Sequence, residues 1–303
     1  MCPSPAVDLT YQVESLLPGA TNRVTEVAHR PGGKAVNVAR VLHTLGAEVT
    51  VLAPLDGPTG AQLAGDLAAL DLTVESVPAG VPTRRTITVV ESVGRHPTVL
   101  SEPARVERWP DLAARYTELV PRAHTVVISG SMPAGVPDGA LAELVATARA
   151  HARPVVVDTS GPALTEALAA RPTIVKPNAH ELTDLTGEHH PHVAAARLAR
   201  HHGVIVVASL GADGLIAVDG DTAWHARPAG RLDGNPTGAG DALVAGIALG
   251  LAGGHALPDL LAEAVALSAA SVLQPHAGDI DPAHVAELRS GVVIARLEED
   301  GSR

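Results

Sequence analysis

The sequence predicts an α/β fold with a mostly parallel central sheet flanked by helices and a small β-sheet lid. Short β-branched runs alternate with Ala- and Leu-rich helical stretches through most of the 303 residues, as in a parallel sheet that is covered on both faces. Two regions, at about residues 8–29 and 71–102, instead contain short strand-like runs without helices between them. We therefore expect a single domain over residues 1–303, with lid strands contributed by these two regions.

The alternating elements are apolar runs that end in polar or turn residues. Buried strands are predicted at residues 49–53, 125–129, 154–158, 173–176 and 204–209. Helices are predicted at residues 36–45, 59–70, 138–150, 161–169 and 192–202, and the region from 239 to about 288 is mainly helical. Ligands of such sheets bind beyond the carboxyl ends of the strands, so the segments that follow the strands are the candidates for a site.

The lid is predicted from short runs that no helix separates. Its strands are expected at residues 9–13, 23–29, 72–77, 85–91 and 98–102. The alternative is that the two regions form irregular surface loops.

Composition excludes several classes of partner. The net charge is −11 and aromatic residues make up 1% of the chain, which argues against a nucleic-acid binder with a basic face or stacking aromatics. The longest uncharged run, at residues 242–256, is too short to span a membrane. The single cysteine excludes an intramolecular disulfide, and the first residues do not resemble a signal peptide. We expect a cytoplasmic protein that binds neither nucleic acid nor membrane.

The sharpest chemical signal is at residues 235–241 (NPTGAGD), which a long apolar helix follows. The amides of Gly238, Ala239, Gly240 and Asp241 would lie free at the helix N-terminus, where they can bind anionic oxygens. A carboxylate there can accept the proton of an attacking hydroxyl, so Asp241 is a candidate base for phosphoryl transfer to an alcohol. The alternative is that Asp241 only caps the helix.

A second glycine-rich turn opens a helix at residues 31–37 (PGGKAVN). Lys34 and Asn37 can donate hydrogen bonds there, and Gly32 and Gly33 allow the backbone to approach a ligand closely. The spacing is not that of a P-loop, and the absence of GxGxxG argues against a dehydrogenase. The alternative is an ordinary loop with a solvated lysine.

Two further segments follow predicted strands. In residues 176–181 (KPNAHE), Asn178 and Glu181 are three apart at a helix start and can face one ligand. An amide and a carboxylate suit a hydrated Mg²⁺, which takes few protein ligands; the alternative is a capping box. Residues 209–214 (SLGADG) form a strand–turn–strand element that can support a nucleotide through its backbone or serve only as a hairpin turn.

Taken together and in order, these four segments resemble the PfkB/ribokinase superfamily of carbohydrate kinases over almost the entire chain. Residues 32–37 look like its N-terminal signature, 178–181 like its NxxE element, 209–214 like its nucleotide-binding turn and 235–241 like its C-terminal signature. The greatest similarity is to the branch that contains 1-phosphofructokinase and tagatose-6-phosphate kinase. The supporting segments are residues 3–8 (PSPAVD), 101–103 (SEP), 129–135 (SGSMPAG) and 175–178 (VKPN).

The resemblance implies a ribokinase-like fold and transfer of the γ-phosphoryl group of MgATP to a sugar phosphate, with fructose 1-phosphate or tagatose 6-phosphate as acceptor. Asp241 would be the base, beside Gly238, Ala239 and Gly240. The residues expected to hold ATP are Lys176, Ser209, Leu210, Gly211, Ala212, Asp213, Gly214 and Gly240. Those expected to hold the sugar are Asp8, Gly32, Gly33, Lys34, Asn37 and Arg84. Asn178 and Glu181 would order Mg²⁺ through water, and the lid would pair two chains into a homodimer.

Three departures from the family pattern bear on these expectations. Ala35 replaces the last glycine of GGKG, which adds a methyl group where the backbone meets the sugar. Thr88 stands where the branch commonly has a lysine, and Arg85 would compensate at the phosphate. The chain begins almost at the sugar-site motif, so we expect the native N-terminus to extend further and to supply a first strand.

Other functions stay open on sequence alone. The missing lysine at position 88 favours an unphosphorylated sugar or a nucleoside as an alternative acceptor. A sugar- or nucleotide-sensing protein without turnover is a further alternative, against which the intact segments 178–181 and 238–241 argue. The sequence does not identify the acceptor, the oligomeric state or any monovalent-cation requirement.

Overall fold

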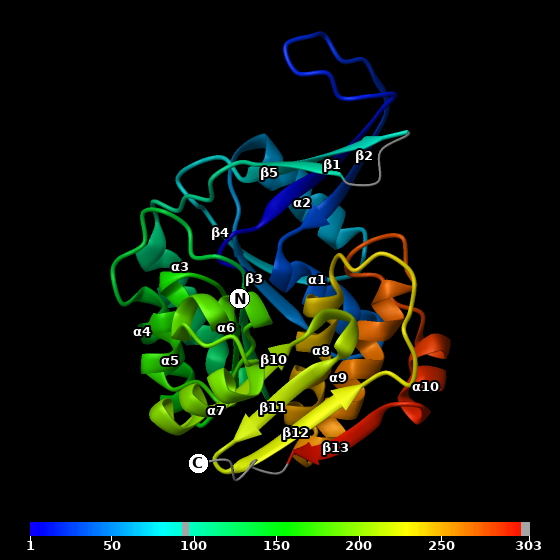
Figure 1. Ribbon diagram of the computed structural model, residues 1–303. Coiled ribbons are helices and arrows are strands. Elements are labelled where there is room, and N and C mark those ends of the chain that lie inside the picture. The colour runs from blue at the N-terminus through cyan, green and yellow to red at the C-terminus, as the bar shows by residue number, and fades with distance from the viewer. Residues whose placement is uncertain (93–96, 298–303) are drawn as a thin grey trace.

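The computed structural model describes residues 1–92 and 97–297 of the chain, which form three sheets and a set of packed helices (Figure 1). The helices are α1 (Lys34–Thr44), α2 (Gly57–Ala68), α3 (Trp109–Leu119), α4 (Ala140–Ala150), α5 (Pro162–Ala170), α6 (Ala179–Thr186), α7 (Pro191–His202), α8 (Ala239–Ala252), α9 (Leu257–Val272) and α10 (Pro282–Ser290). The strands are β1 (Ala6–Val13), β2 (Val24–Gly32), β3 (Thr50–Pro54), β4 (Thr73–Val77), β5 (Arg84–Glu91), β6 (Thr98–Ser101), β7 (Val126–Ser129), β8 (Val155–Asp158), β9 (Ile174–Val175), β10 (Ile205–Ser209), β11 (Leu215–Asp219), β12 (Thr222–Arg227) and β13 (Val293–Leu297).

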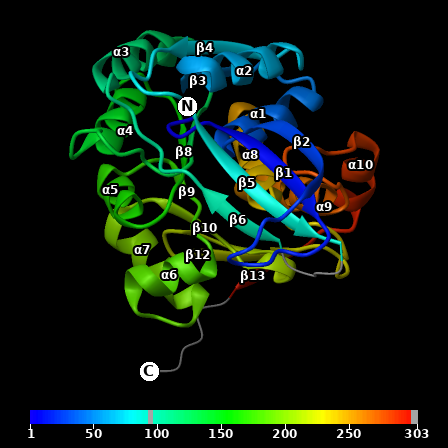
Figure 2. The ribbon, with the colours of Figure 1, turned by 90° about the horizontal axis from the view of Figure 1, so that it is seen from above.

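The largest sheet has seven strands in the order β13-β12-β11-β10-β9-β8-β7. The pairs from β7 to β10 are parallel, and the pairs from β10 to β13 are antiparallel. Figure 2 shows α4, α5 and α7 on one side of the parallel strands and α1, α8 and α9 on the other. Strand β8 is buried on both faces, because Val155 and Val157 pack in one core and Val156 packs in the other. The predicted α/β class is confirmed, with helices on both faces of the sheet.

The elements predicted between residues 36 and 209 in the alternating part of the chain are confirmed to within two residues at each end. Their positions were predictable because a strand that is buried on both faces is a continuous apolar run. The carboxyl ends of β7, β8 and β9 come together at Ser129, Asp158 and Lys176. This edge of the sheet is where the polar segments identified in the sequence converge.

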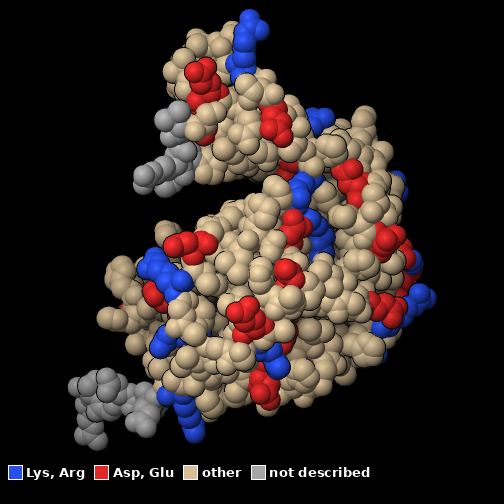
Figure 3. All heavy atoms as spheres, turned by 90° about the vertical axis from the view of Figure 1, so that its right-hand side faces the viewer, with Lys and Arg blue, Asp and Glu red and all other residues tan. Residues whose placement is uncertain are grey.

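A second sheet, which we call the small sheet, has four strands in the order β2-β1-β5-β6. It projects from the helical body (Figure 1), and Figure 3 shows an open groove between it and the body. The strand predicted at residues 72–77 is present as β4, but its assignment to the lid is wrong: β4 pairs in parallel with β3, which α2 connects to it, in a separate two-stranded sheet. Residues 93–96 of the predicted lid region lie outside the described residues.

The first residues of the chain lie between β3 and β7. The terminal amine of Met1 donates to the carbonyl of Val127 at 2.8 Å. The amide of Cys2 donates to the carbonyl of Leu52, also at 2.8 Å. These contacts join the two-stranded sheet to the seven-stranded sheet. Within residues 1–92 and 97–297, no helix combines the length and apolar character needed to cross a membrane.

Candidate active site

The N-terminus of α8 is built on a glycine turn. Gly238 is the N-cap with a φ of 85°, and a Cβ there would lie 2.7 Å from the Cβ of Ala277, so both the backbone conformation and the packing require glycine. The amides of Gly240 and Asp241 lie in the first turn, where a helix has no acceptor of its own for them. The prediction that the amide of Ala239 is free is wrong, because this amide donates to the carbonyl of Pro236 at 3.2 Å.

The carboxylate of Asp241 is buried and contacts α1. Only 7% of the residue is exposed, and its Oδ2 accepts a 2.8 Å hydrogen bond from Nδ2 of Asn37. No side chain caps α8, so the interpretation of Asp241 as a simple helix cap is wrong. Burial raises the pKa of Asp241 to about 6, although Asn37 opposes this rise. A carboxylate with this pKa is ionised at neutral pH and basic enough to accept a proton in catalysis.

A second buried carboxylate, Asp158, ends β8 and contacts two lysines. Its exposed fraction is 1%. The Nζ of Lys34 lies 3.3 Å from its Oδ2, the Nζ of Lys176 lies 3.2 Å from its Oδ1, and the Oγ of Ser129 donates to its Oδ2 at 3.2 Å. Asp158 was not among the candidate residues predicted from sequence. The available signal was a charged residue that ends a run of buried valines at the carboxyl end of a predicted strand.

Lys34 is held by charge as well as by the turn that precedes it. Burial alone would lower the pKa of Lys34, but Asp158, Asp241 and Glu181 together raise it above its ordinary value. The interpretation of Lys34 as a freely solvated lysine is therefore wrong. Its ammonium group is a fixed positive charge close to Asp241.

The glycine pair between β2 and α1 permits close packing against β1. A Cβ on Gly32 would overlap the carboxylate of Asp8. Gly33 is the N-cap of α1 with a φ of 107°, and a Cβ there would lie 3.0 Å from the Sγ of Cys2. Burial raises the pKa of Asp8. The structure thus brings Asp8, both glycines and Asn37 together where β1, β2 and α1 meet.

Arg84 is the first residue of β5, an inner strand of the small sheet. Its Nη1 donates to the Oγ of Ser101 at 2.8 Å and to the carbonyl of Glu102 at 3.1 Å. Its Nε is buried without a hydrogen-bond partner among the described residues. Arg84 and Arg105 line a small cavity of about 10 Å³. The guanidinium group of Arg84 is therefore tied to the end of β6 and the residue that follows it, and has one buried donor without a partner in the described part of the chain.

A cavity of about 410 Å³ lies beside the N-terminus of α8. Its walls include Ser209, Gly211, Ala212, Gly214 and Gly240 of the predicted ATP-binding set. The other lining residues are Pro228, Arg231, Leu232, Asp233, Gly234, Pro236, Ala239, Leu243, Val265, Ser268, Ala269 and Val272. The volume is that of a small-molecule site.

Two residues of the predicted ATP-binding turn do not line this cavity. Leu210 packs against the core instead, and the carbonyl of Asp213 contacts Nε2 of His225 at 2.9 Å. The turn itself is tight, because a Cβ on Gly214 would overlap the carbonyl of Ala226 on β12.

Asn178 and Glu181 form a capping box at the start of α6. The Oδ1 of Asn178 accepts from the amide of Glu181 at 2.9 Å, and the Oε2 of Glu181 accepts from the amide of Asn178 at 2.8 Å. The structural alternative considered for this segment is therefore confirmed. The box leaves Oε1 of Glu181 for a contact through water, which suits Mg²⁺. In the described part of the chain, no cluster of three or more His, Cys, Asp or Glu side chains could hold a metal directly.

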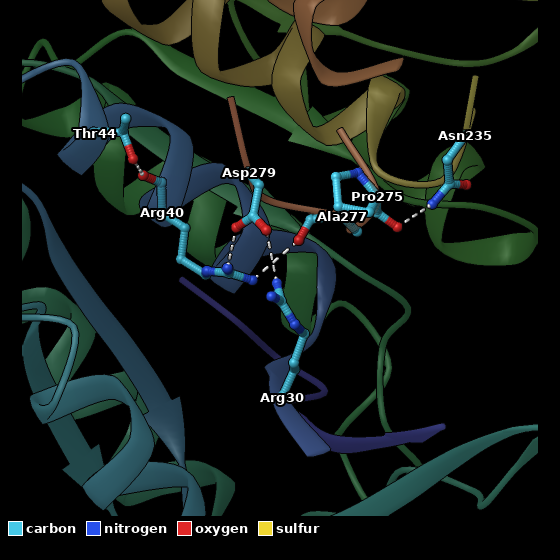
Figure 4. Close-up of polar contacts among 7 residues, drawn as sticks. All are labelled: Arg30, Arg40, Thr44, Asn235, Pro275, Ala277 and Asp279. Carbon is cyan, nitrogen blue, oxygen red and sulfur yellow. Dashed lines mark hydrogen bonds and ion pairs between the residues drawn. The ribbon is translucent and has the colours of Figure 1, made fainter. Parts of the chain in front are cut away.

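A cluster of polar contacts that the sequence did not suggest surrounds the loop at residues 275–279 (Figure 4). Asp279 forms ion pairs with Arg30, at 2.8 Å, and with Arg40. Arg40 also donates to the carbonyl of Ala277 at 3.0 Å, and Asn235 donates to that of Pro275 at 2.9 Å. The loop that contains residues 275–279 is thereby tied to β2, to α1 and to the segment that leads into α8.

Comparison with known proteins gives one consistent result. A profile of the family described as "pfkB family carbohydrate kinase" matches residues 4–284. A 1-phosphofructokinase of Xanthomonas campestris pv. campestris is 37% identical over 264 residues, covering 82% of this chain and 82% of that protein. A 1-phosphofructokinase of Rhodobacter capsulatus is 37% identical over 303 residues, covering 96% of this chain and 95% of that protein.

Solved structures of lower sequence identity share the fold. The phosphofructokinase-2 of Escherichia coli in complex with potassium has a TM-score of 0.88 and 27% identity, covering 95% of this chain and 96% of that one. The same enzyme in complex with fructose-6-phosphate has a TM-score of 0.85 and 28% identity, with the same coverage of both chains.

Proposed function

The chain belongs to the pfkB family of carbohydrate kinases, and we propose that it transfers the γ-phosphoryl group of ATP to a hydroxyl of fructose 1-phosphate. The observation that carries the proposal is a buried carboxylate, Asp241, at the N-terminus of α8 beside the 410 Å³ cavity. Base and anion-binding amides lie in one helical turn, as phosphoryl transfer to an alcohol requires.

The proposed chemistry assigns each side chain a step. Asp241 accepts the proton of the attacking sugar hydroxyl, and Asn37 orients the carboxylate through their 2.8 Å hydrogen bond. The amides of Gly240 and Asp241 donate to the oxygens of the phosphoryl group as negative charge develops on them. Lys34 and Lys176 add positive charge at the same place. The nucleotide occupies the cavity lined by the turn at residues 209–214.

We further propose that Glu181 contacts Mg²⁺ through water, using the carboxylate oxygen that the capping box leaves. When bound, Mg²⁺ neutralises charge on the ATP phosphates. In this proposal Asn178 acts as the N-cap that fixes Glu181, since its own oxygen is used by the helix.

The acceptor is proposed from the relatives and from the groove. Both curated relatives named above are 1-phosphofructokinases at 37% identity, and Asp8, Gly32 and Gly33 form a cluster that suits sugar hydroxyls. Arg84, the first residue of β5, would contact the phosphate already on the sugar through its guanidinium group.

A substrate panel tests the proposal. Release of ADP from MgATP is measured with fructose 1-phosphate, tagatose 6-phosphate, fructose 6-phosphate and the unphosphorylated sugars. Fructose 1-phosphate should give the highest kcat/KM. Preference for an unphosphorylated sugar would refute the phosphate assignment, and no stimulation by any sugar would favour a sensor.

We also propose that the small sheet is a lid and the contact surface of a homodimer. Its edge strands leave unpaired backbone groups, which natural proteins normally cover. Its exposed apolar side chains are Val24, Val27, Val99 and Leu100. A second copy that presents the same strands would cover both, and closure over the groove would exclude water from the reaction.

A further inference from the structure

Three separate chain segments deliver polar side chains to the carboxylate of Asp158. Lys34 is the first residue of α1, Ser129 ends β7 and Lys176 follows β9. All four contacts lie between 3.2 and 3.4 Å: the Nζ of Lys34 to Oδ2 and Oδ1, the Nζ of Lys176 to Oδ1, and the Oγ of Ser129 to Oδ2. Asp158 itself is 1% exposed, so it contacts these groups rather than solvent.

The two ammonium groups that meet on Asp158 also lie next to the proposed reaction centre. A Cβ on Gly240 would lie 3.8 Å from the Nζ of Lys176, which places this ammonium at the first turn of α8. The charged groups that influence Asp241 are Asp158, Lys34 and Lys176. Two carboxylates and two ammonium groups therefore lie close together, and Glu181 adds a further negative charge near Lys34.

The negative charge of Asp158 affects where the two lysine side chains lie. A buried carboxylate without a partner is costly, and so is a buried ammonium such as that of Lys176, which is 5% exposed. Without Asp158, the ammonium groups of Lys34 and Lys176 would repel each other, and both would be attracted to the carboxylate of Asp241. With Asp158 between them, they stay apart, ordered and available on their remaining donors.

We propose that Asp158 is a positioning residue, which fixes Lys34 and Lys176 as a pair of ordered cations for the terminal phosphate of ATP and prevents them from pairing with Asp241. The inference rests on the proposed function, since it concerns the same site. In this proposal Asp158 acts through the two lysines and not on the substrates themselves.

The first test is Asp158→Asn, which keeps the shape of the side chain and removes its charge. ATP affinity measured by calorimetry should fall about tenfold or more, because the lysines are no longer held in place. With fructose 1-phosphate, the midpoint of the acid limb of kcat/KM should move to lower pH by about half a unit or more, because a charge that raises the pKa of Asp241 is lost. A purely structural role would lower the stability of the protein but leave the ATP affinity of the folded protein unchanged.

Asp184→Asn is the matched control. Asp184 is an exposed carboxylate on α6 that pairs with His180, so the same change of charge there should alter neither ATP affinity nor the pH profile. If Asp158→Asn does not fold, Lys34→Gln offers a second route, because Lys34 is 42% exposed at its side chain. It should weaken ATP binding and move the acid limb to higher pH.

The two proposals fail in different ways. If Asp158→Asn binds ATP as tightly as the unaltered protein and keeps its acid limb, the positioning role is refuted. Loss of ATP affinity in Asp158→Asn but not in Asp184→Asn supports it even if the sugar panel gives no turnover. In that case the kinase proposal alone fails.

Discussion

Burial has two opposite effects on Asp241. It makes the carboxylate a stronger base, and it makes the ionised form destabilise the folded protein. With a pKa of about 6, kcat/KM should fall about tenfold per pH unit below pH 6, since only the ionised carboxylate accepts a proton. Rates from pH 4.5 to 8 check this. A midpoint near the ordinary value of 3.8 would contradict it.

The variant Asn37→Ala shows whether the acid limb of kcat/KM comes from Asp241 or from the phosphate groups of the substrates. These phosphate groups titrate near the same pH. The hydrogen bond from Asn37 lowers the pKa of Asp241, so its loss should move the acid limb upward with the same substrates. An unmoved limb would assign it to the substrates instead.

The charge on Asp241 should also reduce the stability of the folded protein. Its pKa is 3.8 ordinarily and about 6 when folded, so the unfolded chain releases this proton first as the pH rises. The cost is absent below about pH 4, grows between pH 4 and 6 and is fully present above pH 6. It amounts to roughly 3 kcal/mol at most.

Asp241→Asn should therefore raise the free energy of unfolding at pH 7.5 and raise it less at pH 5. Asparagine keeps an oxygen that can accept the hydrogen bond from Asn37. Denaturant unfolding at the two pH values measures the difference. A lower free energy of unfolding at pH 7.5, or an equal increase at both pH values, would show that ionised Asp241 does not destabilise the folded protein.

At the level of single residues, the sequence identified the residue types but not all of their partners. Burial of Asp241 and its contact with Asn37 bring together segments 204 positions apart, and only the resemblance to a family suggested that they meet. Asp158 was missed because its role depends on the neighbours of β8 in the sheet, which sequence spacing does not reveal. The capping box of Asn178 and Glu181 was predictable, because both partners lie in one helical turn.

At the level of elements, the N-terminus of α8 depends on the close approach of the loop that follows α9. Gly238→Ala would place a methyl group 2.7 Å from Ala277 in addition to straining the left-handed backbone. Gly254 at the other end of α8 has a φ of +66° and no neighbour within 4 Å, so Gly254→Ala carries the backbone cost of about 1–2 kcal/mol alone.

Gly238→Ala should lose more stability than Gly254→Ala and should lose most of its turnover, because the anion-binding turn is displaced. Gly254→Ala should keep its turnover. Denaturant unfolding and ADP release measure both effects. Equal losses of stability, with turnover intact in both variants, would show that the contact with Ala277 is unimportant.

The error in the lid prediction is also a matter of elements. Strand β4 shows a polar, partly exposed pattern like the strands of the small sheet, yet it follows α2 and pairs in parallel with β3. The strand–helix–strand alternation therefore includes one more strand than the sequence suggested. Pairing between strands is set by tertiary packing, which local propensity does not encode.

At the level of the whole molecule, the small sheet projects over the groove and carries exposed apolar residues. If it forms a homodimer, Val27→Lys should convert the protein to a monomer, because Val27 is 60% exposed on the edge strand β2. Val193→Lys is the control, since Val193 is 51% exposed on α7. Light scattering after size exclusion gives the mass, and an unchanged mass for Val27→Lys would refute this interface.

The proposed kinase activity depends on one buried carboxylate, Asp241 at the start of α8, which would deprotonate the sugar hydroxyl. The most direct measurement is turnover of Asp241→Asn with MgATP and fructose 1-phosphate, together with ATP affinity by calorimetry. ATP affinity should be nearly retained, while kcat should fall by about 10²–10⁴-fold, which is the contribution of general-base catalysis. An unchanged kcat would contradict this role of Asp241.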